Sequence, residues 1–245
     1  MPRMQSHQDR TADHPGRSSD RVVVLFTKPA RPGRVKTRMT PHYTAAEACS
    51  LHDALLRDVL AQTAVPEASY ELVVAWAVDE GEALPDVGDW VASPAPRVVR
   101  QSGNDLGERL VAALGDQCTF GAERVAAIGS DHPELDRDGL EAAFAGLDDH
   151  DCVLAPAQDG GYSLIALRCE AVVPALFEGI DWSTPRVLEQ TLSRLEGHGL
   201  SALLLEVIHD IDEPADLEAL ARRLAASSGP ARAVATLAWF EEHGR

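Results

Sequence analysis

Short apolar runs alternate along this chain with longer segments whose apolar residues recur at helical spacing. The run RVVVLFT at 21–27 is rich in β-branched side chains, which is typical of a strand buried on both faces. Similar runs predict strands at 71–78, 96–101, 123–131, 151–157, 161–167 and 202–208. Helical spacing predicts helices at 44–63, 104–118, 136–147, 170–178, 183–197, 213–226 and 230–243. Thr44 and Glu47 stand at capping-box spacing, and Asn104 is the predicted cap of the second helix.

This alternation predicts an α/β fold with a mostly parallel sheet flanked by helices. Right-handed crossovers would then place the carboxyl ends of the strands along one edge, where open α/β sheets bind ligands. We expect residues 21–245 to form a single domain. Residues 1–20 lack the apolar stretch of a signal peptide and are predicted to be a disordered or extended tail.

The charge of the chain narrows the classes of function. Its formal net charge is −17 and its pI is near 4.8, which argues against a general role in binding nucleic acids or membrane surfaces. Nothing approaches the apolar length of a membrane span. The four cysteines lack metal-ligand spacing, so we expect reduced core thiols in a cytoplasmic protein.

Against this acidic background, the loop KPARPGRVKTR at 28–38 contains five Lys or Arg side chains. It is either a solvated surface run or a site for an anion that offsets the repulsion between its cations. At an effective dielectric of about 20, one cation–phosphate contact at 4 Å contributes roughly 4 kcal/mol before desolvation, which favours a polyphosphate site. The loop is not a P-loop, because Arg34 rather than Lys follows Gly33, and no G-x-G-x-x-G follows any predicted strand.

Three acidic side chains follow predicted strands. Asp131, in AIGSDHP, is either a turn cap or a ligand for Mg2+ or Mn2+, which prefer carboxylate oxygen. Asp212, in HDIDEPADL, is equally consistent with a helix cap and with a second metal ligand. Asp159 precedes Gly160 and Gly161, a pattern typical of a tight turn or of close backbone approach to a ligand.

Taken together, six segments resemble one family: FTKPARPGRVKTRM, QSGNDLGERL, AIGSDHPEL, LAPAQDGGYSLIAL, DWSTPRVLEQTL and HDIDEPADL. They are similar to the GT-A-like transferases often called radical-SAM/selenodomain-associated transferase 1, whose members are frequently labelled glycosyltransferases. The resemblance covers about residues 21–220. It implies a nucleotide-diphospho-sugar transferase fold, which is a Rossmann-like mixed sheet with the nucleotide over the strand carboxyl ends.

The resemblance also implies site residues. It places the nucleotide against Lys28, Gly33, Arg34, Lys36, Arg38, Gln101, Gly103 and Asp105, and the metal on Asp131 and Asp212. It places the acceptor or sugar near Asp159, Gly160, Gly161 and Tyr162, with Trp182, Ser183 and Thr184 opposite. His132 stands where the family pattern has cysteine, which leaves open a third metal ligand.

Three functions follow from these assignments. The first is glycosyl transfer from a nucleotide-diphospho-sugar to a small-molecule acceptor, with Asp131, Asp159 and Lys36 as catalytic residues and Asp159 as the base. The second is nucleotidyl transfer with release of pyrophosphate. VKTRM is similar to the corresponding loop of 2-phospho-lactate guanylyltransferase, and five cations suit a triphosphate better than a diphosphate. The third is a non-catalytic nucleotide-binding domain. The sequence leaves the base, sugar, acceptor and oligomeric state open.

Overall fold

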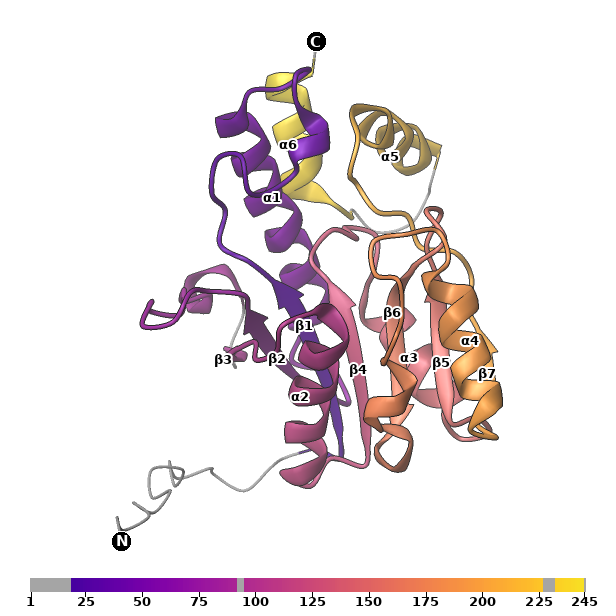
Figure 1. The fold of residues 1–245 in the computed structure, drawn as a ribbon. Coiled ribbons are helices and arrows are strands. Elements are labelled where there is room, and N and C mark those ends of the chain that lie inside the picture. Colours follow the sequence, from indigo (N-terminus) through magenta and orange to yellow (C-terminus); the bar gives the residue numbers. More distant parts are fainter. Residues whose placement is uncertain (1–18, 92–94, 227–231, 245) are drawn as a thin grey trace, which may run out of the picture.

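A seven-stranded mixed sheet forms the centre of the computed structural model, which describes residues 19–91, 95–226 and 232–244 (Figure 1). Nearly all of the predicted tail at 1–20 therefore lies outside the described residues. The strand order is β3-β2-β1-β4-β6-β5-β7, and only β6 runs antiparallel to its neighbours. The strands are β1 (Arg21–Thr27), β2 (Glu71–Trp76), β3 (Arg97–Arg100), β4 (Arg124–Gly129), β5 (Cys152–Pro156), β6 (Tyr162–Arg168) and β7 (Ala202–Leu204). The predicted fold class is confirmed.

Six α-helices accompany the sheet within the described ranges, and one predicted helix is wrong. They are α1 (Ala45–Thr63), α2 (Leu106–Thr119), α3 (Arg137–Gly146), α4 (Val187–Gly197), α5 (Pro214–Ala226) and α6 (Val234–His243). The segment 170–178 instead forms two 3-10 turns, at Cys169–Ala171 and Pro174–Leu176. Val173 between them is extended, because the residue before a proline avoids helical geometry.

The predicted helix caps are partly confirmed. Thr44 and Glu47 form the capping box of α1. The cap of α2 is Asp105 and not Asn104, because the Asp105 carboxylate accepts a hydrogen bond from the Glu108 amide at 2.8 Å. The Asn104 amide donates to the Glu108 side chain instead.

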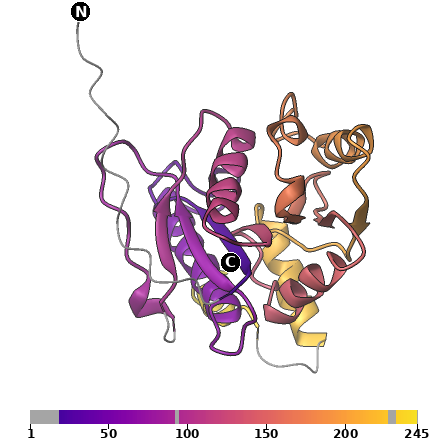
Figure 2. The same ribbon diagram turned by 90° about the horizontal axis from the view of Figure 1, so that it is seen from below.

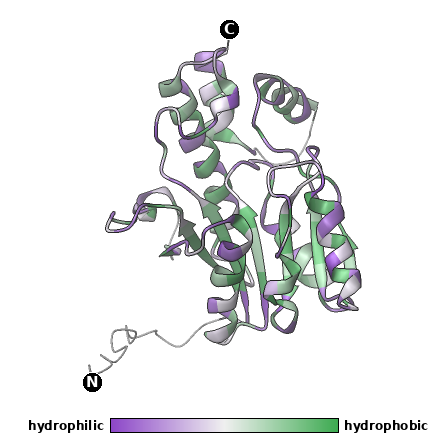
Figure 3. Ribbon diagram, in the orientation of Figure 1, coloured by the Kyte–Doolittle hydropathy of each residue, from purple (hydrophilic) through white to green (hydrophobic). Residues whose placement is uncertain are grey.

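Helices cover both faces of the sheet, as Figure 2 shows from below. Leu110 and Leu114 of α2 and Leu195 of α4 pack on one face, while helices α1 and α3 pack on the other. Successive β1 residues 22–25 alternate between these two cores and are fully buried, as the β-branched run predicts. The hydropathy colouring in Figure 3 accordingly shows apolar strands between helices with polar outer faces.

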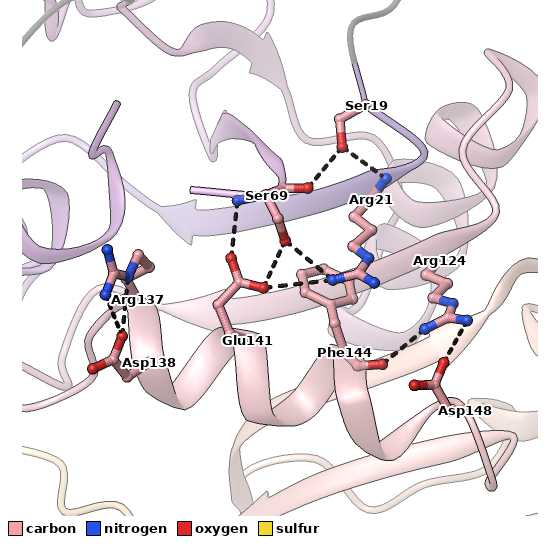
Figure 4. Close-up of polar contacts among 9 residues, drawn as sticks. All are labelled: Ser19, Arg21, Ser69, Arg124, Arg137, Asp138, Glu141, Phe144 and Asp148. Carbon is pink, nitrogen blue, oxygen red and sulfur yellow. Dashed lines mark hydrogen bonds and ion pairs between the residues drawn. The ribbon is translucent and has the colours of Figure 1, made fainter. Parts of the chain in front are cut away.

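Polar contacts fasten α3 to the amino ends of β1 and β4, away from the carboxyl ends of these strands (Figure 4). The Glu141 carboxylate accepts hydrogen bonds from the Ser69 amide (2.9 Å) and hydroxyl (2.6 Å), and pairs with Arg21 at 3.5 Å. Arg124 donates to the Phe144 carbonyl at 3.0 Å. These charges position a helix and take no part in the site described below.

A disulfide joins Cys118, at the end of α2, to Cys169 after β6, so the expectation of four reduced thiols is wrong. The topology explains the pairing. The antiparallel β6 ends beside the start of β4, with Arg168 opposite Arg124, and α2 ends shortly before β4 begins. Cys49 and Cys152 are free thiols. No helix in the described parts of the chain is long and apolar enough to cross a bilayer.

Helix α6 lies beside the first half of α1, in a separate apolar cluster with α5 (Figure 1). The buried Asp58 carboxylate of α1 accepts hydrogen bonds from the amides of Ala235 (2.8 Å) and Thr236 (2.7 Å), the first turn of α6. Burial raises the pKa of Asp58, although these amides favour its charged form. One carboxylate of α1 thus accepts hydrogen bonds from two backbone amides in the first turn of α6, where amides have no partner within the helix.

Replacing Asp58 with alanine is therefore expected to lower the free energy of unfolding by about 1–2 kcal/mol, the usual loss for a helix cap. Urea denaturation of the wild type and the variant would measure this change. Asp53→Ala is the matched control, because Asp53 lies on the same helix and caps no amide among the described residues. An equal loss in both variants would contradict a capping role for Asp58.

Candidate functional site

A cavity of about 510 Å³ opens at the carboxyl ends of β1, β2 and β4. This is the edge at which the alternation of strands and helices predicts ligand binding. Seven predicted site residues line the cavity: Lys28, Lys36, Arg38, Gln101, Asp131, Ser183 and Asp212. The other residues lining it are Phe26, Thr27, Thr37, His52, Ala77, Leu106, Arg109, Gly129 and Ser130.

Lys36 is the central charge of this cavity. Its side chain is only 2% exposed, and its ammonium lies 2.8 Å from Asp131 Oδ2 and 2.9 Å from Asp212 Oδ1. Arg38 pairs with the second oxygen of Asp212 at 3.1 Å. The backbone of Lys36 is left-handed (φ 46°, ψ 42°), immediately before a 3-10 turn that begins at Thr37. The basic loop, β4 and the segment before α5 thus meet around one ammonium group.

The pairing keeps these groups charged. Burial lowers the pKa of Lys36, but the two carboxylates more than compensate and the net shift is upward. Burial likewise raises the pKa of Asp131, yet the Lys36 ammonium outweighs it and lowers that pKa to about 2. At neutral pH the centre of the site therefore holds the charged Asp131 carboxylate and the Lys36 ammonium, with Asp212 and Arg38 beside them.

Two buried histidines border Asp131. His52 of α1 places Nε2 3.0 Å from the Lys28 carbonyl oxygen and Nδ1 3.8 Å from Asp131 Oδ1. Burial lowers the pKa of both His52 and His132. Among the residues that the structure describes, no three His, Cys, Asp or Glu side chains converge as metal ligands. The geometry therefore gives no support to His132 as a third protein ligand.

The five cations of the basic loop do not all face the cavity. Arg31 turns to the segment after β2, where it pairs with Asp79 (3.4 Å) and Glu82. Arg34 is exposed, and neither it nor Gly33, which has a φ of 74° in the turn, lines the cavity. Arg109 of α2 adds a cation to the cavity lining from another element, and its Nε donates to the Gly103 carbonyl at 3.1 Å.

The segment before α2 contains three residues predicted to bind the nucleotide, and two of them, Gly103 and Asp105, have a structural role. Gln101 lines the cavity, and its amide nitrogen donates to the carbonyls of Thr27 (3.0 Å) and Ala75 (2.8 Å). Asp105 caps α2. Gly103 has a φ of 135°, and a Cβ there would lie 2.7 Å from the Glu108 Cβ. Asp105 and Gly103 therefore shape the start of α2, outside the cavity lining.

The predicted catalytic base is held in a turn. Asp159 Oδ1 accepts a hydrogen bond from the Gly161 amide at 2.9 Å, and Asp159 is not among the residues lining the cavity. Gly160 has a φ of 87°, and a Cβ there would lie 2.2 Å from the Pro185 carbonyl oxygen. The turn joins the antiparallel strands β5 and β6, as an Asp-Gly signal predicts, and it packs directly on the segment before α4. The geometry gives no support to Asp159 as the base.

The remaining predicted acceptor residues are divided. Ser183, with a φ of 63°, lines the main cavity. Tyr162 lines a second, mostly apolar cavity of about 140 Å³, which shares Phe26, Leu106 and Gly129 with the first. Trp182 packs in the core beside α2, and the Thr184 hydroxyl donates to the Asp181 carbonyl at 2.7 Å. The structure therefore brings only part of this set to the cleft.

Several cavity residues do not stand out in the sequence and were not predicted. Thr27 and Ser130, whose hydroxyls are 3.1 Å apart, end strands that the sequence does predict, so their position at the edge was a usable signal. His52 and Arg109 sit within regular helical patterns, where nothing local distinguishes them from other polar residues. Only the packing of α1 and α2 against the sheet brings them to the site.

The fold is a mixed α/β fold of the kind found in nucleotidyltransferases and GT-A-like proteins. The chain belongs to the family described as "Uncharacterized protein conserved in bacteria (DUF2064)", which matches residues 60–184. None of the curated proteins matches the sequence.

Solved structures show the same fold. One similar structure is a "putative nucleotide-diphospho-sugar transferase" from Desulfovibrio desulfuricans G20, with a TM-score of 0.82 and 28% identity over 92% of this chain and 96% of that chain. The 4-diphosphocytidyl-2C-methyl-D-erythritol synthase of Anaerococcus prevotii DSM 20548 has a TM-score of 0.54 and 10% identity, over 84% of this chain and 97% of that one. A cytidylyltransferase of Leptospira borgpetersenii has a TM-score of 0.51 and 13% identity, over 91% and 94%. At such low identities, the last two bear on the fold alone.

Proposed function

We propose that this protein is a metal-dependent transferase that uses a nucleotide-activated donor, and that the donor is a nucleotide-diphospho-sugar. The observation that carries the proposal is the convergence of Lys36, Arg38, Asp131 and Asp212 in a cavity at the carboxyl edge of the sheet. Similarity to the Desulfovibrio protein, which is described as a "putative nucleotide-diphospho-sugar transferase", supports a sugar nucleotide. The resemblance to the radical-SAM/selenodomain-associated transferases supports it too. A small-molecule acceptor completes the proposed reaction.

The residues present fit one divalent cation. Asp131 and Asp212 already converge on a single cation, the Lys36 ammonium, and Asp131 Oδ1 is buried with no hydrogen-bond partner among the described residues. Mg2+ is typically held by one or two carboxylates together with substrate phosphates, so a third protein ligand is not required. When bound, Mg2+ or Mn2+ would neutralise charge on the departing diphosphate.

The side chains of the cavity supply the rest of the proposed function. Lys28 and Arg38 of the basic loop, together with Arg109 of α2, would bind the phosphates and stabilise the charge that develops as the diphosphate leaves. Gln101, whose amide nitrogen is bound to two carbonyls, would present its remaining oxygen near the base or ribose. Asp159 as the base stays a prediction from the sequence.

Nucleotidyl transfer is the second candidate, and the arrangement of cations favours it. Lys28 and Arg38 of the basic loop and Arg109 of α2 line the same cavity, and three cations from two elements would suit a triphosphate or a donor beside a phosphorylated acceptor. The sequence favours a triphosphate because the loop has five cations. Two of these, Arg31 and Arg34, do not line the cavity, so this argument for a triphosphate is weaker in the structure. Glycosyl transfer therefore remains first.

A thermal-shift panel of nucleoside triphosphates and nucleotide-diphospho-sugars, each with and without Mg2+ or Mn2+, would test the proposal. We expect one sugar nucleotide to raise the melting temperature of the wild type only when metal is present. Asp131→Asn should abolish that response, while Asp138→Asn, a surface change on α3, should retain it. Stabilisation by a triphosphate alone would instead favour nucleotidyl transfer. No response to any nucleotide would contradict both candidates.

A further inference from the structure

The Lys36 ammonium lies where the proposed metal would have to bind. Three of the four oxygens of Asp131 and Asp212 are already engaged, two by Lys36 and one by Arg38. The fourth, Asp131 Oδ1, is buried and has no hydrogen-bond partner within the described parts of the chain. A divalent cation would thus find one available carboxylate oxygen, next to a positive charge held between the two acids.

We infer that Lys36 excludes a divalent cation from Asp131 and Asp212 in the nucleotide-free protein, and that a bound polyphosphate draws the ammonium away and opens the pair to metal. This inference rests on the proposed function, since it takes these two carboxylates as the metal ligands. It adds an order of events: metal enters with the polyphosphate or after it, and not before.

The charges of the site favour this order. A divalent cation bound between the same two carboxylates would lie close to the Lys36 ammonium, and the two positive charges would repel each other strongly. A polyphosphate changes the balance because it brings several negative oxygens into a cavity that Lys36 also lines. The ammonium then gains a new anionic partner, while the metal gains phosphate oxygens in addition to the two carboxylates.

The local structure lets the side chain move while the backbone stays in place. The Lys36 carbonyl accepts a hydrogen bond from the Met39 amide at 3.0 Å, and Met39 is fully buried in the core that α1 shares with α5 and α6. The aliphatic part of the side chain has several rotatable bonds, and its ammonium is a compact charge without the fixed geometry of a guanidinium. Transfer to a phosphate would therefore take place by rotation of the side chain, with the backbone of Lys36 held in place.

The inference is tested by titrating the protein with Mn2+ alone and counting bound metal by electron paramagnetic resonance. We expect Lys36→Met to bind Mn2+ at least about tenfold more tightly than the wild type, a size typical of coupling between sites. Arg34→Met, a change of the same type on the same loop but outside the cavity, should bind like the wild type. Lys36→Met/Asp212→Asn should lose the gain.

A second readout does not depend on counting metal. In Lys36→Met no ammonium separates the carboxylates of Asp131 and Asp212. Mn2+ should therefore raise the melting temperature of this variant and leave that of the wild type unchanged. If the methionine variant does not fold, both measurements are made on Lys36→Gln, which keeps a polar side chain without the charge.

The outcomes separate the inference from the proposed function. If the nucleotide-free wild type binds Mn2+ as tightly as Lys36→Met, the inference is wrong, while the metal-dependent function stands. If no variant binds Mn2+ alone, and the wild type also fails to respond to metal with every nucleotide of the panel, the metal-dependent function falls and the inference with it. Tighter binding by Lys36→Met that disappears with Asp212→Asn supports both.

Discussion

Removal of the Cys118–Cys169 disulfide is expected to lower the free energy of unfolding by about 4 kcal/mol. The two cysteines are 51 residues apart, and the loop-entropy relation gives about this value for a loop of that length. The bond fastens the end of α2 to the segment after β6, so its loss frees the unfolded chain while the core between α2 and the sheet stays intact. We expect the variant to fold and to unfold at lower denaturant concentration.

Denaturation of the wild type and of Cys118→Ala/Cys169→Ala, each with and without reductant, would measure this effect. Reductant should destabilise the wild type to the level of the double variant and leave the double variant unchanged. Cys49→Ala, which removes a free and partly buried thiol, is the control. A wild type insensitive to reductant, with free thiols at Cys118 and Cys169, would instead restore the expectation from the sequence. The compartment of the protein stays a prediction.

Replacing Lys36 with methionine is expected to lower the free energy of unfolding by about 2–3 kcal/mol at neutral pH. Loss of one partner of a buried ion pair usually costs about 3–5 kcal/mol, because the remaining charge is left uncompensated. Here the loss is smaller, since solvent screens Asp131 and Asp212, whose side chains are 36% and 33% exposed. Arg38, which pairs with Asp212 but is mostly exposed, should contribute far less.

The difference between wild type and Lys36→Met should shrink in acid. In the wild type the pKa of Asp131 is lowered from 3.8 to about 2, so its contribution is complete above about pH 4 and is lost as the pH falls towards 2. In the variant, burial without the ammonium would raise this pKa, so protonation relieves the uncompensated charge and stabilises the folded state as the pH falls.

Urea denaturation of both proteins between pH 7 and pH 3 would test the pH dependence. Arg34→Met is the matched control and should follow the wild type throughout. A difference that stays constant over this range would mean that Lys36 stabilises the fold by packing and not by its charge.

Much of the fold was predictable because its signals are local. The β-branched run at 21–27 predicts a strand buried on both faces, and β1 is that strand, inside the sheet between β2 and β4. The prediction of a helix at 170–178 failed because the apolar spacing there is helical, while Val173, which precedes Pro174, is extended and interrupts the pattern. The prediction of reduced thiols failed at Cys118 and Cys169, because pairing depends on the antiparallel direction of β6, which hydropathy does not encode.

For the site, the sequence by itself determined the kinds of group and the edge at which they gather. Lys36, Asp131 and Asp212 stand out because each follows or precedes a recognisable element, and the ends of parallel strands share one edge. Only the tertiary structure decided the partners: Lys36 is held between carboxylates 95 and 176 residues away. It also paired Arg31 with Asp79 and Glu82, held Asp159 in a turn outside the cavity lining, and brought in His52 and Arg109. Such choices depend on packing between distant segments, and no local pattern carries that information.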